Sequence, residues 1–287
     1  MSPLWKPIEK YIRTLNGSGS VLVAHHYTNI SGALGILKSG RIWFTERAHL
    51  NDPSEISHGV ETAKAILKEQ GREEDASRLD VCTQKIFRDF LFFSASFSRK
   101  SDDLYQWNNY ADDGHGVILS FKFSAFSSPE IYIDKFIPNN PTAIVCPMSY
   151  NSADLRLVIT DIINEWNGAN IEDLCDHVLI ISGMFKNDCW KHEEEYRFFV
   201  HGRRQSILKS NYLKFRKQNG KTISYLDIPI QNWDSVDDFP INRICLGPAA
   251  SSDIDVQLGN FLSSKNIPNP ATALSRSALP YRSLRSI

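Results

Sequence analysis

The sequence predicts an α+β protein with a largely antiparallel central sheet, which could be split, and with flanking helices. Short runs rich in β-branched and aromatic residues recur along the 287-residue chain. Segments of helical periodicity stand between these runs without regular alternation. Asn219-Gly220 lies between two such runs and is typical of a hairpin, because Asn and Gly adopt the positive φ angles of a tight turn. This irregular order favours antiparallel pairing.

Helices are predicted where apolar residues recur at helical spacing next to capping residues. Ser31 can cap a short helix that Gly40 stops. Asp52 suits the N-cap of the following helix, with Pro53 in its first turn and Glu55 at the capping-box position. The expected helices cover 4–14, 31–38, 52–70, 74–90, 105–110, 155–166 and 171–185.

Strands are predicted where apolar runs are bounded by turn residues. The first run ends in two histidines and a tyrosine, and Asp113-Gly114 marks the turn before the strand at 116–123. The expected strands cover 21–24, 41–46, 91–98, 116–123, 130–136, 142–150, 195–200, 212–217, 221–228 and 243–246.

Composition divides the chain into three segments. Residues 1–20 are expected to form an N-terminal arm, because a Gly- and Ser-rich break follows the first amphipathic helix. Residues 21–266 are expected to form a single α+β catalytic or binding domain. Residues 267–287 contain Ser, Pro and Arg and are expected to form a poorly packed tail.

Charge and cysteine content narrow the function classes. The chain has 32 basic and 33 acidic residues, so its net charge of -1 creates no global attraction to nucleic acid or to an anionic membrane. Its 5 cysteines include no C-x-x-C pair, so we expect neither a disulfide framework nor a metal site. We expect no signal peptide, and the sequence contains no apolar run of about 20 residues. We expect a cytoplasmic protein, and its oligomeric state is left open.

Two groups of aromatic residues are candidates for a binding cleft. His25, His26 and Tyr27 follow a buried apolar run, so they emerge where a strand ends. Strand neighbours alternate faces, so His26 and Tyr27 share one cleft only if the strand ends or bulges there. Trp107 and Tyr110 lie three residues apart and share one helix face, which would suit stacking of a planar ring. The alternatives are a solvated strand end for the first group and core packing for the second.

The densest group of functional side chains lies between residues 186 and 198. On a strand, Glu193, Glu195 and Arg197 would point to one face, and Glu194 would point to the other. Two carboxylates and a guanidinium can orient a ribose hydroxyl and stabilise a developing cation. A salt-bridged, solvent-facing strand is the alternative. If Glu195 lies at a strand end near solvent, its charge contributes little to folding.

These segments together resemble a bacterial family known as domain of unknown function 2971, part of which is associated with phage-defence gene neighbourhoods. The resemblance spans about 26 to 250. The motifs that carry it are His26-Tyr27-Thr28, Asn51-Asp52-Pro53-x-Glu55, Phe97-Ser98, Trp107-x-x-Tyr110-Ala111, Gly116, Lys186, Trp190-x-x-Glu193-x-Glu195-Tyr196-Arg197 and Ile244-Cys245-Leu246-Gly247-Pro248.

The same segments are similar to ADP-ribosyltransferases of the His-Tyr-Glu type. By that resemblance His26 would hold the adenosine ribose, Tyr110 or Tyr27 would stack on nicotinamide, and Glu195 would contact the nicotinamide ribose. Glu193-x-Glu195 is similar to the Glu-x-Glu element of arginine-directed members. Those members normally begin with Arg and carry a Ser-Thr-Ser strand, to which Ser94-Ala95-Ser96 is only an approximation.

Two functions follow as hypotheses. In the first, a catalytic pair, Glu195 and Glu193, cleaves the nicotinamide-ribose bond of NAD and passes ADP-ribose to a protein or nucleic acid. His26, Tyr27, Trp107, Tyr110 and Arg197 would bind the NAD. In the second, the cleft is a non-catalytic sensor or effector module that binds a nucleotide, a nucleic acid or a phage protein. Its phosphate contacts would come from Arg203, Arg204, Lys209, Lys214, Arg216 and Lys217.

Overall fold

The computed structural model describes residues 2–16, 23–49, 56–122, 128–137, 139, 141–218, 220–235, 238–264 and 274–281. Its helices are α1 (Trp5–Asn16), α2 (Ile30–Ser39), α3 (Ser57–Glu69), α4 (Glu73–Asp89), α5 (Leu104–Tyr110), α6 (Pro129–Asp134), α7 (Ser152–Glu165), α8 (Ile171–Ser182), α9 (Arg204–Leu208) and α10 (Asp253–Ser264), with 3-10 turns η1 (Arg47–His49) and η3 (Asp188–Glu193). Its strands are β1 (Val23–Thr28), β2 (Arg41–Glu46), β3 (Phe90–Ser98), β4 (Val117–Lys122), β5 (Thr142–Pro147), β6 (Glu195–Arg203), β7 (Leu213–Gln218), β8 (Lys221–Pro229), β9 (Ile241–Leu246) and β10 (Leu274–Arg276).

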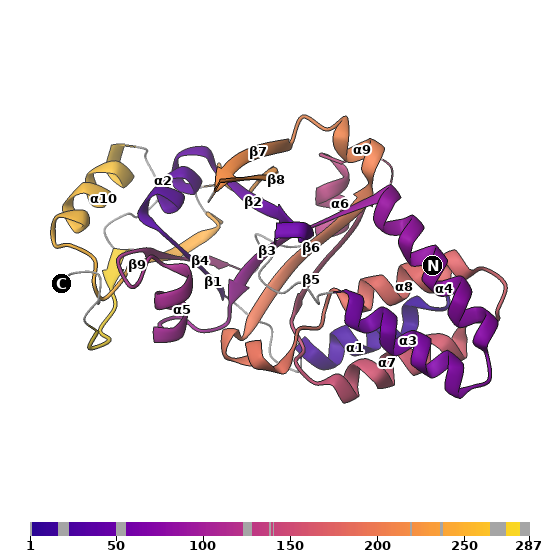
Figure 1. Ribbon diagram of the computed structural model, residues 1–287. Helices are drawn as coiled ribbons and strands as arrows, with labels where there is room; N and C mark the ends of the chain where they lie inside the picture. Colours follow the sequence, from indigo (N-terminus) through magenta and orange to yellow (C-terminus); the bar gives the residue numbers. More distant parts are fainter. Residues whose placement is uncertain are drawn as a thin grey trace.

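The strands form a split sheet that branches at β3 (Figure 1). One edge of β3 pairs along its whole length with β6, and β6 pairs with β5. The other edge is shared, because β2 pairs at Phe93 and Ser94 while β1 pairs only at Ser98. From there β1 leads to β4, β9 and β10, and β2 leads to β8 and β7. The two branches diverge over residues 95–97 of β3.

Two hydrophobic cores cover the sheet. One lies between the sheet and helices α2, α6, α9 and α10, and it contains Phe44, Phe93 and Phe121. The other lies among α1, α3, α4, α7 and α8, which gather at one end of the molecule in Figure 1 and pack against β5 and β6. Ile144 and Phe199 contribute the sheet's side of this second core. The helical layer therefore packs against one face of β6 and supports this strand.

The predicted α+β class is confirmed, and every described strand pair except β9 with β10 is antiparallel. Gly40 ends α2 with a positive φ of 64°, as expected, although Asn29 rather than Ser31 caps the start of that helix. The β7–β8 hairpin is confirmed by the pairing of Gln218 with Lys221.

The strand predicted over 130–136 is wrong, because this segment is helix α6. Pro129 occupies its first turn, where proline needs no hydrogen-bond donor. Ile133 and Ile137, one helical turn apart, are both fully buried, while Ile131 is exposed. Helices α9 and α10 were not predicted. The predicted cap at Asp52, with Pro53 and Glu55, lies outside the described residues.

Both chain ends pack more closely than their composition predicts. Helix α1 is not a free arm, because Leu4, Ile8 and Tyr11 are buried in the second core. In the segment expected to be a loose tail, β10 extends the sheet beside β9, and the Tyr281 hydroxyl donates to Asp113. Four of the cysteines are buried and Cys189 is exposed. Within the described ranges, no helix is long and apolar enough to cross a membrane.

Candidate functional site

A cavity of about 360 Å³ opens where β1 and β2 diverge from β3. Its walls come from β1, β2, β3, β6, α5 and the β7–β8 hairpin, so segments far apart in sequence meet there. Six of the seven predicted site residues line it, namely His26, Tyr27, Tyr110, Glu193, Glu195 and Arg197. The split of the sheet creates this space, because no described strand pairs with residues 95–97 of β3 on that side.

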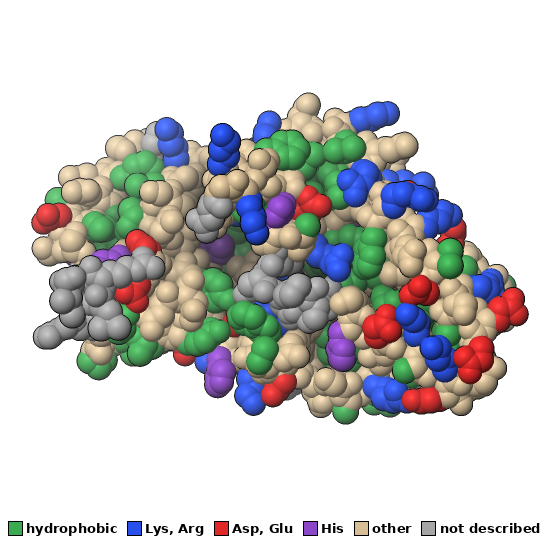
Figure 2. All heavy atoms as spheres, viewed as in Figure 1, with side chains coloured by type: hydrophobic (Ala, Val, Ile, Leu, Met, Phe, Trp, Pro, Cys, Tyr) green, Lys and Arg blue, Asp and Glu red, His purple; other side chains and the backbone are tan. Residues whose placement is uncertain are grey.

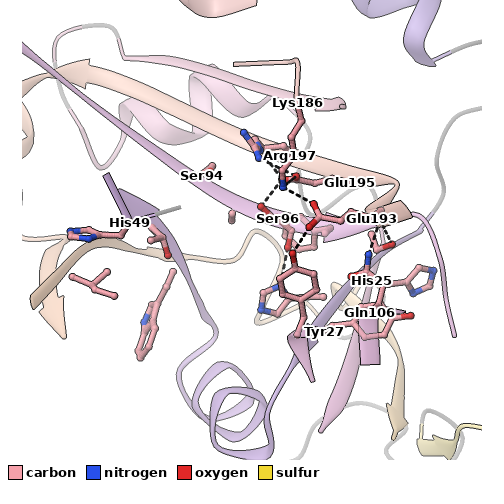
Figure 3. Close-up of a pocket in the computed structure, with 18 of the residues that line it drawn as sticks. His25, Tyr27, His49, Ser94, Ser96, Gln106, Lys186, Glu193, Glu195 and Arg197 are labelled. Atoms are coloured by element: carbon pink, nitrogen blue, oxygen red, sulfur yellow. Dashed lines mark hydrogen bonds and ion pairs between the residues drawn. The ribbon is translucent and has the colours of Figure 1, made fainter. Parts of the chain in front are cut away.

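Four buried charges form the wall of the cavity on the β6 side (Figure 3). Lys186, Glu193, Glu195 and Arg197 are each at most 7% exposed, and their charged ends point toward one another. Lys186 Nζ lies 2.6 Å from Glu193 Oε2 and 3.3 Å from Glu195 Oε2. Arg197 donates through Nε and Nη2 to the two oxygens of Glu195, at 2.6 and 3.0 Å. Two cations therefore balance two anions.

Electrostatics keeps Glu195 ionised. Burial alone would raise its pKa, but the charges of Arg197 and Lys186, with hydrogen bonds from Arg197 and Ser96, outweigh burial and lower the pKa to about 2. The same pairing raises the pKa of Lys186 against the effect of its own burial. Both groups therefore carry their charges throughout the physiological pH range.

The local backbone differs from the predicted strand in one respect. Only Glu195 and Arg197 lie on β6, whereas Glu193 ends the 3-10 turn η3, which Asn187 caps. Glu194 then adopts a positive φ of 42°, and this kink turns Glu193 into the cavity wall and leaves Glu194 exposed. Ser98 and Gln106 each donate at 2.8 Å to the Glu193 carbonyl and hold the kink in place.

Burial also overturns the expectation that Glu195 lies near solvent. Its side chain is 4% exposed and accepts hydrogen bonds from Ser96, Arg197 and Lys186. Removing one partner of such a buried ion pair typically costs about 3–5 kcal/mol, because the other charge is left uncompensated. Glu195 therefore supports folding as well as the site.

The two histidines of β1 occupy different environments. His26 Nδ1 lies 3.1 Å from the Ser96 carbonyl, which can only accept, so Nδ1 carries the proton and Nε2 is free to accept. Burial lowers the pKa of His26, which keeps this neutral form. His25 Nδ1 contacts the Ser120 hydroxyl at 2.9 Å, and burial together with the charge of Arg243 lowers its pKa to about 4.

Of the aromatic candidates, Tyr110 reaches the charge cluster and Trp107 does not. The Tyr110 hydroxyl donates to Glu193 Oε1, and 36% of its surface remains exposed. Trp107 is fully buried beside Tyr27 and its indole donates to Asp102, so it packs in the core, as the alternative interpretation expected, and does not line the cavity. Tyr27 lines the cavity, but its hydroxyl bonds the backbone of Lys100.

Sequence reasoning assigned no site role to Lys186, Trp43 or His49, and it named Arg216 only as a phosphate contact of the alternative binding module. Lys186 belonged to a recognised motif, yet its position between two carboxylates depends on the fold. Trp43, Arg216 and His49 line the opposite wall and come from β2, β7 and η1. The fold brings these residues to the cavity, because β2 pairs with β3 and β8, and β8 pairs with β7.

One family model matches the chain over residues 106–198, and its description is "Protein of unknown function (DUF2971)". The match begins in α5 and ends in β6, so it includes Tyr110, Lys186 and both glutamates of the cluster. It is shorter than the resemblance from 26 to 250 read from the motifs. Searches of curated proteins and of solved structures found no significant match.

Proposed function

We propose that this pocket cleaves the nicotinamide-ribose bond of NAD and transfers ADP-ribose to a macromolecule. One observation carries the proposal: His26 from β1, Tyr110 from α5 and the pair Glu193 and Glu195 beside β6 line a single cavity. Each has the residue type and chain order of the His-Tyr-Glu pattern. The cavity lies within the ordinary size range of small-molecule sites, roughly 300–1,000 Å³.

The reaction needs negative charge beside the ribose. The bond between ribose C1′ and the nicotinamide nitrogen breaks, and its electron pair leaves with nicotinamide, which departs neutral. The ribose becomes an oxocarbenium-like cation, which the acceptor attacks at C1′ while losing a proton to solvent. An ionised carboxylate fixed beside C1′ stabilises charge that exists mainly in the transition state.

Hydrogen-bond capacity divides the roles of the two glutamates. An ionised carboxylate has about four acceptor positions. Glu195 uses four of them on Ser96, Lys186 and the two Arg197 nitrogens. Glu193 accepts only from Tyr110 and Lys186 among the described residues. Glu193 therefore contacts the ribose in this proposal, and Glu195 holds Lys186 and Arg197 in position.

In this proposal Tyr110 and His26 contact different parts of NAD. The exposed part of the Tyr110 ring offers a stacking surface for nicotinamide, beside the glutamate that its hydroxyl contacts. His26 Nε2, free to accept, would take a hydrogen bond from a ribose hydroxyl.

The test is nicotinamide release from NAD and transfer of label from NAD to cell extract. We expect Glu193→Gln to lower turnover about 100- to 1,000-fold, the usual effect of removing one electrostatic contact of a transition state. Glu194→Gln is the matched control, because its side chain is 51% exposed and outside the cavity. Equal turnover by wild type and folded Glu193→Gln, or no NAD cleavage by wild type, would reject the proposal.

A second candidate is a non-catalytic module that binds a nucleotide or a phage protein in the same pocket. The balance of charge favours it, because Lys186 and Arg197 neutralise the two carboxylates. Binding of NAD without nicotinamide release would support this candidate. A part in phage defence, implied by the family resemblance, is tested by plaque counts on cells that express wild type or Glu193→Gln.

A further inference from the structure

The wall opposite the glutamates is a platform of a guanidinium and two aromatic rings that are tilted by 42° to each other. The Trp43 and Tyr225 ring centroids lie 4.5 Å apart, and the Arg216 guanidinium carbon lies 5.0 and 5.5 Å from them. Trp43 is 46% exposed, a large value for a tryptophan in a strand. Trp43 and Arg216 both line the cavity, so the platform begins inside the site and continues to the surface.

Arg216 has unused hydrogen-bonding capacity. One terminal nitrogen donates to Thr45 Oγ1 at 3.4 Å, whereas its buried Nε has no partner in the part of the chain that is described. Asp227, on the neighbouring strand β8, pairs with Arg41 at 2.8 Å. Glu46 alternates with Thr45 along β2, so it belongs to the other face of the sheet. Among the described residues no acidic side chain forms an ion pair with Arg216, so its charge is available to an external anion.

Sheet register extends the positive charge outward from the platform. Tyr225 pairs with Lys214 and Ile223 pairs with Arg216, so Lys214 lies on the same face of the sheet as Tyr225 and Arg216. Lys214 is exposed on β7, the last strand of its branch. A chain that enters the cavity across this face would meet Lys214 first and Arg216 next.

The surrounding segment is strongly basic although the whole protein is nearly neutral. Residues 203–226 contain seven basic side chains and no acidic one, namely Arg203, Arg204, Lys209, Lys214, Arg216, Lys217 and Lys221. In Figure 2, Lys and Arg side chains stand along the upper edge of the molecule over β7 and α9, whereas acidic and basic side chains intermingle over the helical layer. Of these seven residues, Arg216 lines the cavity and Lys214 lies next to it on the same face of β7.

We propose that the acceptor at this site is a single-stranded nucleic acid, with a base stacked on Trp43 and its phosphates on Arg216 and Lys214. The acceptor role rests on the proposed function, whereas the binding can be measured without it. Unpaired bases stack on aromatic and guanidinium planes, and basic side chains follow the backbone. Bases inside a duplex are stacked on each other and cannot use the platform. An acidic peptide would use the charge but leave Trp43 without a partner.

The experiment measures anisotropy of labelled strands of about 12 nucleotides, as DNA, as RNA and as duplex, with the full chain in a salt series. We expect both single strands to bind more tightly than the duplex, and the tighter of the two identifies the acceptor's sugar. Trp43→Ala should weaken single-strand binding roughly 5- to 150-fold, the usual effect of losing one stacked base. Lys214→Gln should reduce the salt slope by about 0.7, the value of one phosphate contact.

Two controls match these variants. Lys10→Gln removes an equal charge from an exposed side chain of α1. Leu157→Ala shortens a side chain that is 63% exposed on α7. Both should bind like wild type. Glu193→Gln should also keep strand binding while losing nicotinamide release, which separates the two proposals. Tighter duplex binding, or unchanged binding by both Trp43→Ala and Lys214→Gln, would overturn the nucleic-acid inference and leave NAD cleavage to be judged by nicotinamide release.

Discussion

Single residues in the pocket wall combine structural and chemical roles. Glu195 begins β6, where a carboxylate is ordinarily solvated, yet here it is buried and accepts from two cations and a serine. Glu193, two residues away, keeps acceptor capacity for a ligand. The two glutamates differ because Glu195 accepts from Ser96 of β3, from Lys186 and from Arg197. The Glu-x-Glu spacing by itself does not specify this difference.

The lowered pKa of Glu195 predicts a pH-dependent contribution to stability. Its pKa falls from a usual 4.5 to about 2 on folding, so the stabilisation is complete above about pH 4.5 and is lost as pH falls toward 2. At 1.36 kcal/mol per pH unit this contribution is about 3 kcal/mol. Urea unfolding of wild type and Glu195→Gln should therefore differ most above pH 4.5 and converge below it.

Glu194, the exposed neighbour of Glu195, provides the control for this pH series. Glu194→Gln should match wild type at every pH, because exposed ion pairs contribute little. A constant difference between wild type and Glu195→Gln from neutral pH down to about pH 2 would contradict the assignment of a buried, ionised Glu195.

At the level of elements, close backbone contacts hold α5 against the sheet and so position Tyr110. A Cβ at Gly116 would lie 2.3 Å from the Thr28 carbonyl oxygen, at the end of β1, and 2.7 Å from that of Ala111, at the end of α5. Real Cβ atoms do not approach oxygen so closely, so any larger residue must push α5 away from β1.

We therefore expect Gly116→Ala to destabilise the fold by about 1–3 kcal/mol and to lower nicotinamide release. Gly35→Ala is the control, because a Cβ there meets nothing within 4 Å. In the interior of α2 this change should raise stability by about 0.5–1 kcal/mol and leave turnover unchanged. The measurements are the melting temperature and the turnover of the two variants. If Gly116→Ala changed neither, the conclusion that close backbone contacts at Gly116 hold α5 in place would be wrong.

At the level of the whole molecule, the two hydrophobic cores support different parts of the sheet. The core around α2 and α10 supports the two diverging branches, and the helical core supports β5 and β6 from behind. Because α1 belongs to the second core, its loss should affect global stability rather than the cavity, which none of its residues lines.

Ile8→Ala tests this division. Ile8 is fully buried, so the change should lower the free energy of unfolding by about 2–5 kcal/mol while folded molecules keep the nicotinamide release proposed for the pocket. The exposed Leu157→Ala should stay within about 0.5 kcal/mol of wild type. If Ile8→Ala unfolded like wild type, α1 would be the free arm that composition predicts.

The sequence by itself determined the local features of this protein. Periodicity, caps and turn residues located most helices and strands, because these signals act between residues a few positions apart. The same local order predicted His26, Tyr110, Glu193, Glu195 and Arg197 as site residues, and all five line one cavity. At 130–136 the local pattern of apolar residues was insufficient, because it predicted a strand. The segment forms helix α6, which buries Ile133 and Ile137 in the core.

Only the tertiary structure decided which side chains meet. The branching at β3 opened the cavity, and pairing of β2 and β7 with β8 brought Trp43 and Arg216 to it. Burial of Trp107 and of the ion pairs around Glu195 likewise depends on packing between distant segments. The physical reason is that the protonation state and partners of a buried group are set by neighbours in space, which sequence spacing does not specify.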